Sequence, residues 1–251
     1  MKAYMGLLKR KYHQLITVLK YPHYKQSPKS LCKILKSDEE INECTRFLYR
    51  LGLESHGLAC KNWDLANIIP EIDSGNFLDM GSSDSYILKN LAIKKIRGEL
   101  NGIDLREPSN PVPGVKYSTG DLLNTKFPDN YFKNITCLSV IEHEVDFHRF
   151  AKETSRLLEN GGKLFVTFDY WNPKVISQVK LYGLAWQPLD KQLVIDLITE
   201  CERQNLYPVQ EMDWALGQAV INNENHSPDP SVSYTFGIVT FEKRDSSRAR
   251  R

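Results

Sequence analysis

The strongest constraint on the fold is an alternation of short apolar runs with amphipathic segments from residue 76 onward. The runs "NFLDM" (76–80), "NITCLSVI" (134–141) and "KLFVTF" (163–168) are typical of buried strands. Apolar residues recur at helical spacing in 85–96 and in 146–162. Strands that alternate with helices in this way form parallel pairs. The sequence therefore predicts an α/β protein with a mostly parallel sheet covered on both faces.

The C-terminal part has a different pattern. Two strand candidates, 207–216 and 234–243, have only a polar, proline-bearing segment between them. Without a crossover helix, they are expected to form an antiparallel hairpin at one edge of the sheet. The tail 244–251 has nothing to bury and is expected to be disordered.

Charge is unevenly distributed at the N-terminus. The net charge is +2, but every charged residue before Asp38 is basic, and Ser37 followed by Glu40 is typical of a capping box that opens a helix. Apolar residues at helical spacing in 3–20 predict a basic amphipathic helix. This helix either docks on the rest of the chain or lies on an anionic membrane. No apolar run approaches the roughly 18 residues of a membrane span. We divide the chain into a basic helical extension (1–60), a main domain (61–243) and a tail.

The five cysteines are scattered and form no C-x-x-C pair, which indicates neither a disulfide framework nor a zinc site. A cytoplasmic location is therefore expected, with peripheral membrane contact through residues 1–36 as an alternative. The histidines show no metal-ligand spacing, so no metal site is predicted. No basic groove interleaved with aromatic residues indicates nucleic acid.

The segment 76–87, "NFLDMGSSDSYI", is the candidate ligand loop. A strand leads to Gly81, and Asp84 or Ser85 is placed to cap the next helix. Asp104 follows 23 residues after Gly81 at the end of the next strand, where a carboxylate suits ribose hydroxyls. A dinucleotide fingerprint would need two further glycines, where Ser83 and Tyr86 stand. The loop therefore disfavours NAD.

These residues carry a family resemblance. The string 79–85 resembles the D-x-G-x-G-x-G loop of class I S-adenosylmethionine-dependent methyltransferases, in particular the methyltransferase type 11-like group. The resemblance continues through "GD" at 120–121, "LSVIEH" at 138–143 and "RLLENGGKLFVTF" at 156–168, and covers roughly residues 61–243. It implies a Rossmann-like, doubly wound, seven-stranded sheet of order 3-2-1-4-5-7-6 with strand 7 antiparallel.

The resemblance also implies S-adenosylmethionine as the cofactor. Asp104 would bind the ribose and Asp121 the adenine amino group, and Gly81 would let the methionine part pass close to the backbone. The full set of cofactor-binding residues that we expect is Asp79, Gly81, Ser82, Ser83, Asp104, Leu105, Asp121, Leu122, Ser139 and Ile141.

The methyl acceptor is expected beyond the fourth and fifth strands of this fold. His143 titrates in the useful range and is either a general base or a group that packs on the cofactor or orients Glu142. Asp169, Tyr170 and Trp171 combine a carboxylate with two rings, which suits a sugar. Together with "KNWD" (61–64) and "YGLAWQPL" (182–189), they resemble a branch associated with polysaccharide and sugar-nucleotide pathways.

The predicted function is O-methylation of a small molecule or of a sugar or glycan precursor. Three alternatives remain. One is a cofactor-binding module without activity, which the serines of the loop motivate. A second is an NAD-type oxidoreductase, which Tyr86 opposes. The third is a membrane-surface scaffold that depends on residues 1–36.

Overall fold

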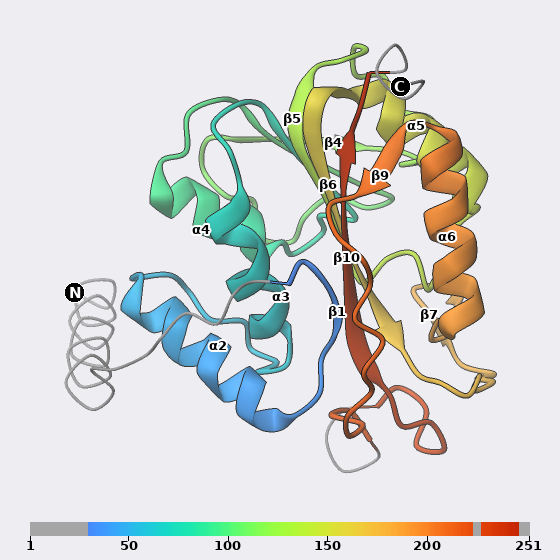
Figure 1. Cartoon of the computed structure of the whole chain (residues 1–251). Coiled ribbons are helices and arrows are strands. Elements are labelled where there is room, and N and C mark those ends of the chain that lie inside the picture. The colour runs from blue at the N-terminus through green and yellow to red at the C-terminus, as the bar shows by residue number, and fades with distance from the viewer. Residues whose placement is uncertain (1–29, 223–226, 246–251) are drawn as a thin grey trace.

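The computed structural model describes residues 30–222 and 227–245 (Figure 1). The predictions for residues 3–20 and for the end of the tail lie outside these residues. No helix in the described part is long and apolar enough to cross a bilayer. All five cysteines are free thiols.

Five parallel strands form the centre of the sheet, and a sixth, β10, lies antiparallel beside β6. These strands are β2 (Phe77–Met80), β3 (Leu100–Asp104), β4 (Val115–Thr119), β5 (Phe132–Leu138), β6 (Leu158–Tyr170) and β10 (Thr235–Lys243). Their order is β4-β3-β2-β5-β6-β10, and β9 (Leu206–Pro208) pairs antiparallel with the far side of β10. The predicted order 3-2-1-4-5-7-6 and the antiparallel seventh strand are confirmed.

The structure adds an eighth strand to the seven that the resemblance implies. This strand, β1 (Cys32–Ile34), pairs antiparallel with residues 237–239 of β10. Cys32 and Ile34 are fully buried. The strand was not foreseen because three residues between lysines carry too little periodic pattern to be recognised.

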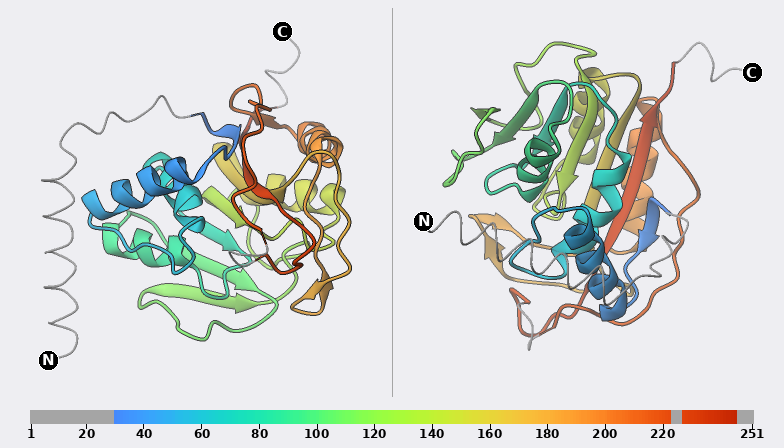
Figure 2. Two further views of the ribbon diagram at one scale, coloured as in Figure 1. Left: turned by 90° about the horizontal axis from the view of Figure 1, so that it is seen from below. Right: turned by 90° about the vertical axis from the view of Figure 1, so that its left-hand side faces the viewer.

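Helices cover both faces of the sheet, as predicted (Figures 1 and 2). One face carries α2 (Asp38–Arg50), α3 (Lys61–Ile68) and α4 (Tyr86–Lys94), and the other carries α5 (Phe147–Leu157) and α6 (Lys191–Arg203). A short 3₁₀ helix (Ile69–Glu71) follows α3, and a hairpin of β7 (Lys180–Leu181) and β8 (Leu184–Ala185) lies apart from the main sheet. The predicted cap of α2 is present, because Ser37 Oγ accepts a hydrogen bond from the Glu40 amide at 3.4 Å.

Successive side chains of β6 point to opposite faces of the sheet and so belong to two separate hydrophobic cores. Phe165 packs on the α2–α4 side, whereas Val166 and Phe168 pack on the α5–α6 side. Since β2, β3, β5 and β6 run parallel, their carboxyl ends meet at one edge of the sheet. That edge is where doubly wound sheets bind ligands.

Candidate active site

Gly81 makes the turn at the end of β2. Its φ is 84°, and its amide donates to the Ile103 carbonyl at 2.8 Å. A Cβ at this position would overlap Cγ2 of Val140, which follows β5. Only glycine satisfies both the positive φ and the close approach. The contact also brings the ligand loop against the segment that contains His143.

The two serines of the loop do not stand where glycine is needed. Neither is among the residues with positive φ, and φ of Ser85 is −65°. Ser85 Oγ caps α4 by accepting from the Leu88 amide at 3.1 Å. The Ser83 amide donates to Asp104 Oδ2 at 3.0 Å. The side chain of Ser82 is buried and packs against β3 at Gly102.

Two carboxylates at strand ends fit the expected cofactor. Asp104 is oriented by the amides of Ser83 and Arg106, one on each oxygen, which leaves a lone pair on each oxygen for a ribose hydroxyl. Asp79 is buried and accepts from Thr136 Oγ1 at 2.6 Å. Burial raises the pKa of Asp79 to about 6 although Ser85 and Thr136 lower it. No ion pair to Asp79 is found within the described residues. A buried carboxylate without a cation suits a positively charged ligand group.

The adenine side of the expected site is more open. Asp121 is half-exposed, accepts from the Leu123 amide at 2.8 Å and lies 3.4 Å from the Arg149 guanidinium. Leu122 packs against the core. Leu105 is 60% exposed, which is unusual for a leucine beside a strand end and suits contact with an adenine ring.

The segment after β5 carries three more predicted residues. Ser139 has a φ of 53°, a strained conformation for serine, and its Oγ accepts a short hydrogen bond from Lys61 Nζ. Ile141 is buried in the core. His143 is partly buried, and its Nδ1 is a buried atom without a hydrogen-bond partner. Burial lowers the pKa of His143, while Asp169 and the backbone of Ala185 oppose this shift.

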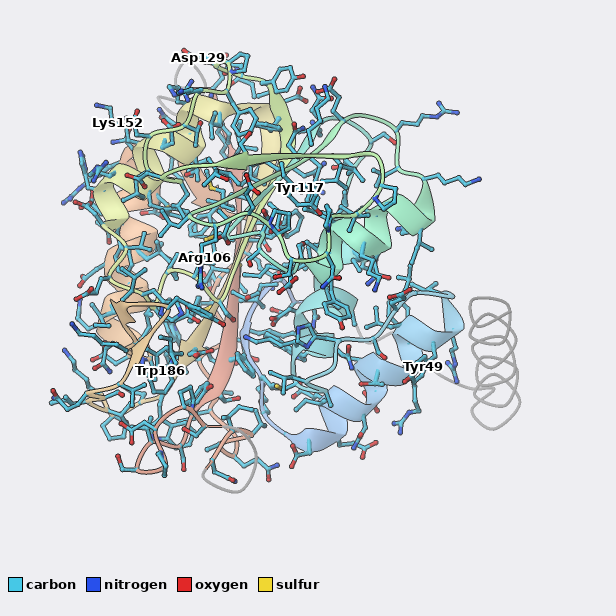
Figure 3. All side chains as sticks on the ribbon, turned by 180° about the vertical axis from the view of Figure 1, so that it is seen from behind. Tyr49, Arg106, Tyr117, Asp129, Lys152 and Trp186 are labelled. Carbon is cyan, nitrogen blue, oxygen red and sulfur yellow. The ribbon has the colours of Figure 1, made fainter. Side chains whose placement is uncertain are left out.

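Asp169, at the end of β6, is the centre of a buried polar group. Its Oδ2 accepts from Trp186 Nε1 at 2.8 Å, and Trp186, labelled in Figure 3, packs edge-on against Tyr234. Its Oδ1 has no hydrogen-bond partner and lies 3.9 Å from Lys61 Nζ. Asp64 of α3 lies 4.0 Å from the same ammonium.

These carboxyl groups share one desolvated environment. Burial raises the pKa of Asp64 to about 6, raises that of Asp169, and raises that of Glu142 well above its ordinary value. Lys61 lowers the pKa of all three. Burial therefore favours the protonated form of these carboxyl groups, most strongly for Glu142, and the lysine favours their charged form.

The structure does not bring all of the predicted acceptor residues together. Tyr170 alternates to the opposite face from Asp169 and packs in the α5–α6 core near Trp214. Trp171 packs against the α2–α4 core, and its amide donates to Leu189. The aromatic ring beside Asp169 is that of Trp186.

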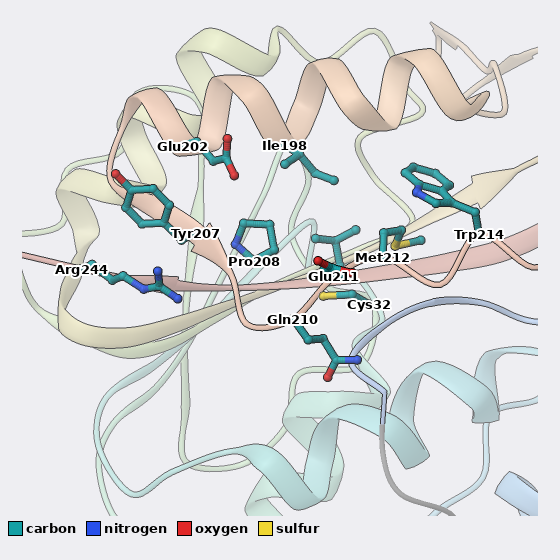
Figure 4. Close-up of a pocket in the computed structure, with 11 residues that line it drawn as sticks. Cys32, Ile198, Glu202, Tyr207, Pro208, Gln210, Glu211, Met212, Trp214 and Arg244 are labelled. Carbon is teal, nitrogen blue, oxygen red and sulfur yellow. The ribbon is translucent and has the colours of Figure 1, made fainter. Parts of the chain in front are cut away.

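A separate pocket of about 640 Å³ lies between α6 and the outer edge of the sheet (Figure 4). It is lined by Ile198, Tyr207, Met212 and Trp214, among others. None of the predicted site residues lines it, so we do not assign the reaction to it.

Comparison with known proteins shows which domain family and which solved structures the chain resembles. Residues 78–166, from β2 into β6, match the family model described as a methyltransferase domain. None of the curated proteins compared with the chain matches it in sequence. A methyltransferase from Mesorhizobium loti, dependent on S-adenosylmethionine, has a similar structure, with a TM-score of 0.52 and 13% identity over 73% of this chain and 97% of that chain.

The fold is that of a Rossmann-like, S-adenosylmethionine-dependent methyltransferase.

Two similar structures contain the cofactor or its product. The geranyl diphosphate C-methyltransferase of Streptomyces coelicolor, with S-adenosylhomocysteine, has a TM-score of 0.52 and 12% identity over 90% of this chain and 92% of that chain. Phosphoethanolamine N-methyltransferase 2 of Haemonchus contortus, with S-adenosylmethionine, has a TM-score of 0.54 and 12% identity over 82% of this chain and 57% of that chain. At these identities the likeness concerns the fold. With the family match, these structures support a methyltransferase with S-adenosylmethionine as its cofactor.

Sequence reasoning did not assign a role to Lys61, Asp64, Trp186 or Tyr234. The first three lie in the segments "KNWD" and "YGLAWQPL", which were noted only as part of the resemblance. The sequence did contain one indication of this cluster: Lys61 and Asp64 stand three residues apart on a helix whose other residues are buried. Buried lysine and aspartate are rare unless they are paired.

Proposed function

We propose that the chain transfers a methyl group from S-adenosylmethionine to a hydroxyl oxygen of a small molecule or of a sugar or glycan precursor. The observation that supports this most is the set of unpartnered buried polar atoms next to the cofactor loop. Those atoms include His143 Nδ1, Glu142 Oε2 and Asp169 Oδ1. Val140, which contacts Gly81, lies within three residues of the first two.

Cofactor binding is assigned to residues that fit it. Asp104 would bind the ribose and Asp121 the adenine amino group. Asp79 would balance the charge of a cationic group, and the backbone of Gly81 and Ser83 would lie next to the cofactor. When bound, S-adenosylmethionine supplies a methyl group already activated by its sulfonium. The chain must then place and deprotonate the acceptor.

His143 is assigned as the general base. Its lowered pKa keeps the imidazole neutral at pH 7. The backbone of Ala185 raises the pKa of the ring, and Nδ1 has no hydrogen-bond partner, so we assign Nδ1 as the atom that accepts the proton. A general base contributes about 10²-fold or more to the rate.

Acceptor recognition is assigned to Asp169 with Trp186. The Trp186 indole fixes one oxygen of Asp169 and leaves the other for a substrate hydroxyl. The indole itself is 1% exposed and packs in the α2–α4 core, so its part is to orient Asp169. Trp186, and not Tyr170, is the aromatic side chain that orients Asp169. Trp171 remains a candidate through its position next to Asp169.

An amine acceptor is the second candidate, since the carboxyl groups of Asp64, Glu142 and Asp169 favour a cation. The Lys61 ammonium, 3.9 Å from Asp169, opposes it. A neutral hydroxyl avoids this repulsion, so we prefer oxygen. An inactive cofactor-binding module is disfavoured because Ser83 and Ser85 impose no backbone strain. A cytoplasmic location remains a proposal, and a membrane role depends on residues outside the described ones.

The test begins with calorimetric titration of S-adenosylmethionine and S-adenosylhomocysteine. We expect binding by the wild type, at least 10-fold weaker binding by Asp104→Ala, and no change in Asp196→Ala, whose carboxylate is exposed on α6. Absence of binding by the wild type would refute the proposal.

Catalysis is then followed as S-adenosylhomocysteine formation with a panel of monosaccharides, sugar phosphates and sugar nucleotides. His143→Gln should leave cofactor affinity unchanged and slow turnover by about 10²-fold. Near-normal turnover would reduce His143 to a packing role.

A further inference from the structure

The cluster of Lys61, Asp64, Thr167 and Asp169 is more extensive than base catalysis requires. Lys61 and Asp64 come from α3, and Thr167 and Asp169 from one face of β6. The side chains of the two aspartates are 3% and 8% exposed, and Thr167 is fully buried. All four residues lie outside the segment 78–166 that matches the methyltransferase family model. They are therefore candidates for what distinguishes this chain from others with the fold.

The Lys61 ammonium is not in hydrogen-bond contact with either carboxylate of this cluster. Lys61 Nζ lies 4.0 Å from Asp64 Oδ2 and 3.9 Å from Asp169 Oδ1, both beyond hydrogen-bond length. The ammonium donates to Ser139 Oγ and lies 4.0 Å above the centre of the Phe236 ring. It has three N–H donors, so at least one remains for another acceptor.

Three oxygens around this ammonium are buried and have no hydrogen-bond partner: Asp64 Oδ1, Asp169 Oδ1 and Thr167 Oγ1. Buried polar atoms are normally satisfied, and several unsatisfied atoms in one place point to a bound group. Thr167 lies close enough to Asp64, and Glu142 to Asp169, to lower the pKa of each carboxyl by hydrogen bonding, so a bound hydroxyl would compete with these two contacts.

The chemistry of the cluster restricts the bound group. It has to accept a hydrogen bond from the ammonium and donate one to a carboxylate. A cationic amine cannot accept and is repelled by Lys61. A carboxylate or a fully ionised phosphate cannot donate, and either is repelled by the aspartates. A hydroxyl does both through a single oxygen atom.

We propose that Lys61, Asp64 and Asp169, with Thr167, form a subsite for a second, non-reacting hydroxyl of the acceptor, so that the acceptor is a diol or polyol. This inference rests on the proposed function and specifies its substrate class. The reacting hydroxyl lies at His143, and the subsite fixes the orientation of the molecule through a neighbouring hydroxyl.

The protonation of the cluster agrees with this role. Burial lowers the pKa of Lys61, but Asp169, Asp64 and Glu142 raise it overall, so the ammonium stays charged. Asp64, with a pKa of about 6, is mostly ionised at pH 7. A donor and an acceptor are thus both available.

The test uses two probes that differ by one hydroxyl, cis-1,2-cyclohexanediol and cyclohexanol. Binding to the full chain saturated with S-adenosylhomocysteine is measured by ligand-observed NMR at millimolar probe concentration. We expect the diol to bind at least 10-fold more tightly than cyclohexanol. Lys61→Met should weaken diol binding at least 10-fold. The control Lys116→Met, which removes an exposed lysine paired with Glu99, should leave it unchanged.

Because Lys61→Met leaves buried carboxylates without a cation, a second variant guards against misfolding. Thr167→Val keeps the shape of the side chain and removes only the unpartnered hydroxyl. It should fold as well as the wild type, bind S-adenosylhomocysteine normally and bind the diol several-fold more weakly.

Four results would overturn the inference: equal binding of the two probes, no binding of the diol, unchanged diol binding in both variants, or loss of S-adenosylhomocysteine binding in folded Lys61→Met. Loss of S-adenosylhomocysteine binding in folded Lys61→Met would assign the cluster to the cofactor. If the cluster holds only water, the diol would not bind. Each leaves the proposed methyl transfer standing, because that proposal fails only if the wild type does not bind the cofactor or transfers no methyl group.

Discussion

Replacing Gly81 with alanine tests the geometry of the cofactor loop most directly. Two separate costs are expected. The first is the backbone cost of placing alanine at a φ of 84°, about 1 to 2 kcal/mol for a left-handed conformation. The second is steric, because the new Cβ would overlap Cγ2 of Val140 and lie 3.5 Å from its Cβ and Cγ1. Val140 is β-branched and stiff, so we expect about 1 to 3 kcal/mol for this overpacking.

Gly114 separates the two costs. Its φ is also 84°, and nothing lies within 4 Å of a Cβ added there. Gly114→Ala should therefore lose only the backbone part of the free energy of unfolding, about 1 to 2 kcal/mol. Gly81→Ala should lose about 2 to 5 kcal/mol, the sum of both costs. Urea unfolding followed by tryptophan fluorescence measures both.

A double-variant cycle with Val140→Ala completes the experiment. Removing Cγ2 should recover most of the steric part, so the two substitutions should couple by about 1 to 3 kcal/mol. Gly81→Ala should also weaken S-adenosylhomocysteine binding, whereas Gly114→Ala should not. If the two glycine variants lose the same free energy within about 0.5 kcal/mol, and no coupling to Val140 appears, the close approach of the loop is refuted.

Three further predictions concern single side chains. Ser85→Ala removes the cap that accepts from the Leu88 amide and should cost about 1 kcal/mol of unfolding free energy; an unchanged urea midpoint would contradict this. Asp79→Asn should gain stability relative to the wild type as pH rises from 4 to 7. The reason is that a folded-state pKa raised from 3.8 to about 6 makes the buried carboxylate lose up to about 3 kcal/mol over that window; parallel pH profiles of the two proteins would disprove it. Trp186→Phe removes the donor to Asp169 Oδ2 and should cost about 1 to 3 kcal/mol, with acceptor turnover falling and cofactor affinity unchanged; normal turnover would argue against Trp186 as an acceptor residue.

Local patterns were sufficient for seven strands of the sheet, though not for β1, and for the backbone of the proposed cofactor loop. Strand and helix periods differ, and Gly81, Asp104 and Ser85 act within a few residues of a strand end, so their roles can be read along the chain. Each of these residues performs the backbone or capping part that was expected: the turn, the carboxylate oriented at a strand end, and the helix cap.

The acceptor side depended on tertiary contacts. Tyr170 and Asp169 are adjacent in sequence, yet the pleat of β6 sends them to opposite faces, so one joins the core and the other the polar cluster. Lys61 reaches Ser139 and Asp169 across 78 and 108 residues of chain, and no local period encodes such distances. The sequence alone determined the fold class and the strand end at which we propose the cofactor loop, because both follow from short-range periodicity and backbone chemistry. Only the packing of α3 and of residues 184–189 against the ends of β5 and β6 decided which side chains form the buried polar cluster, because desolvation and pairing act between segments far apart along the chain.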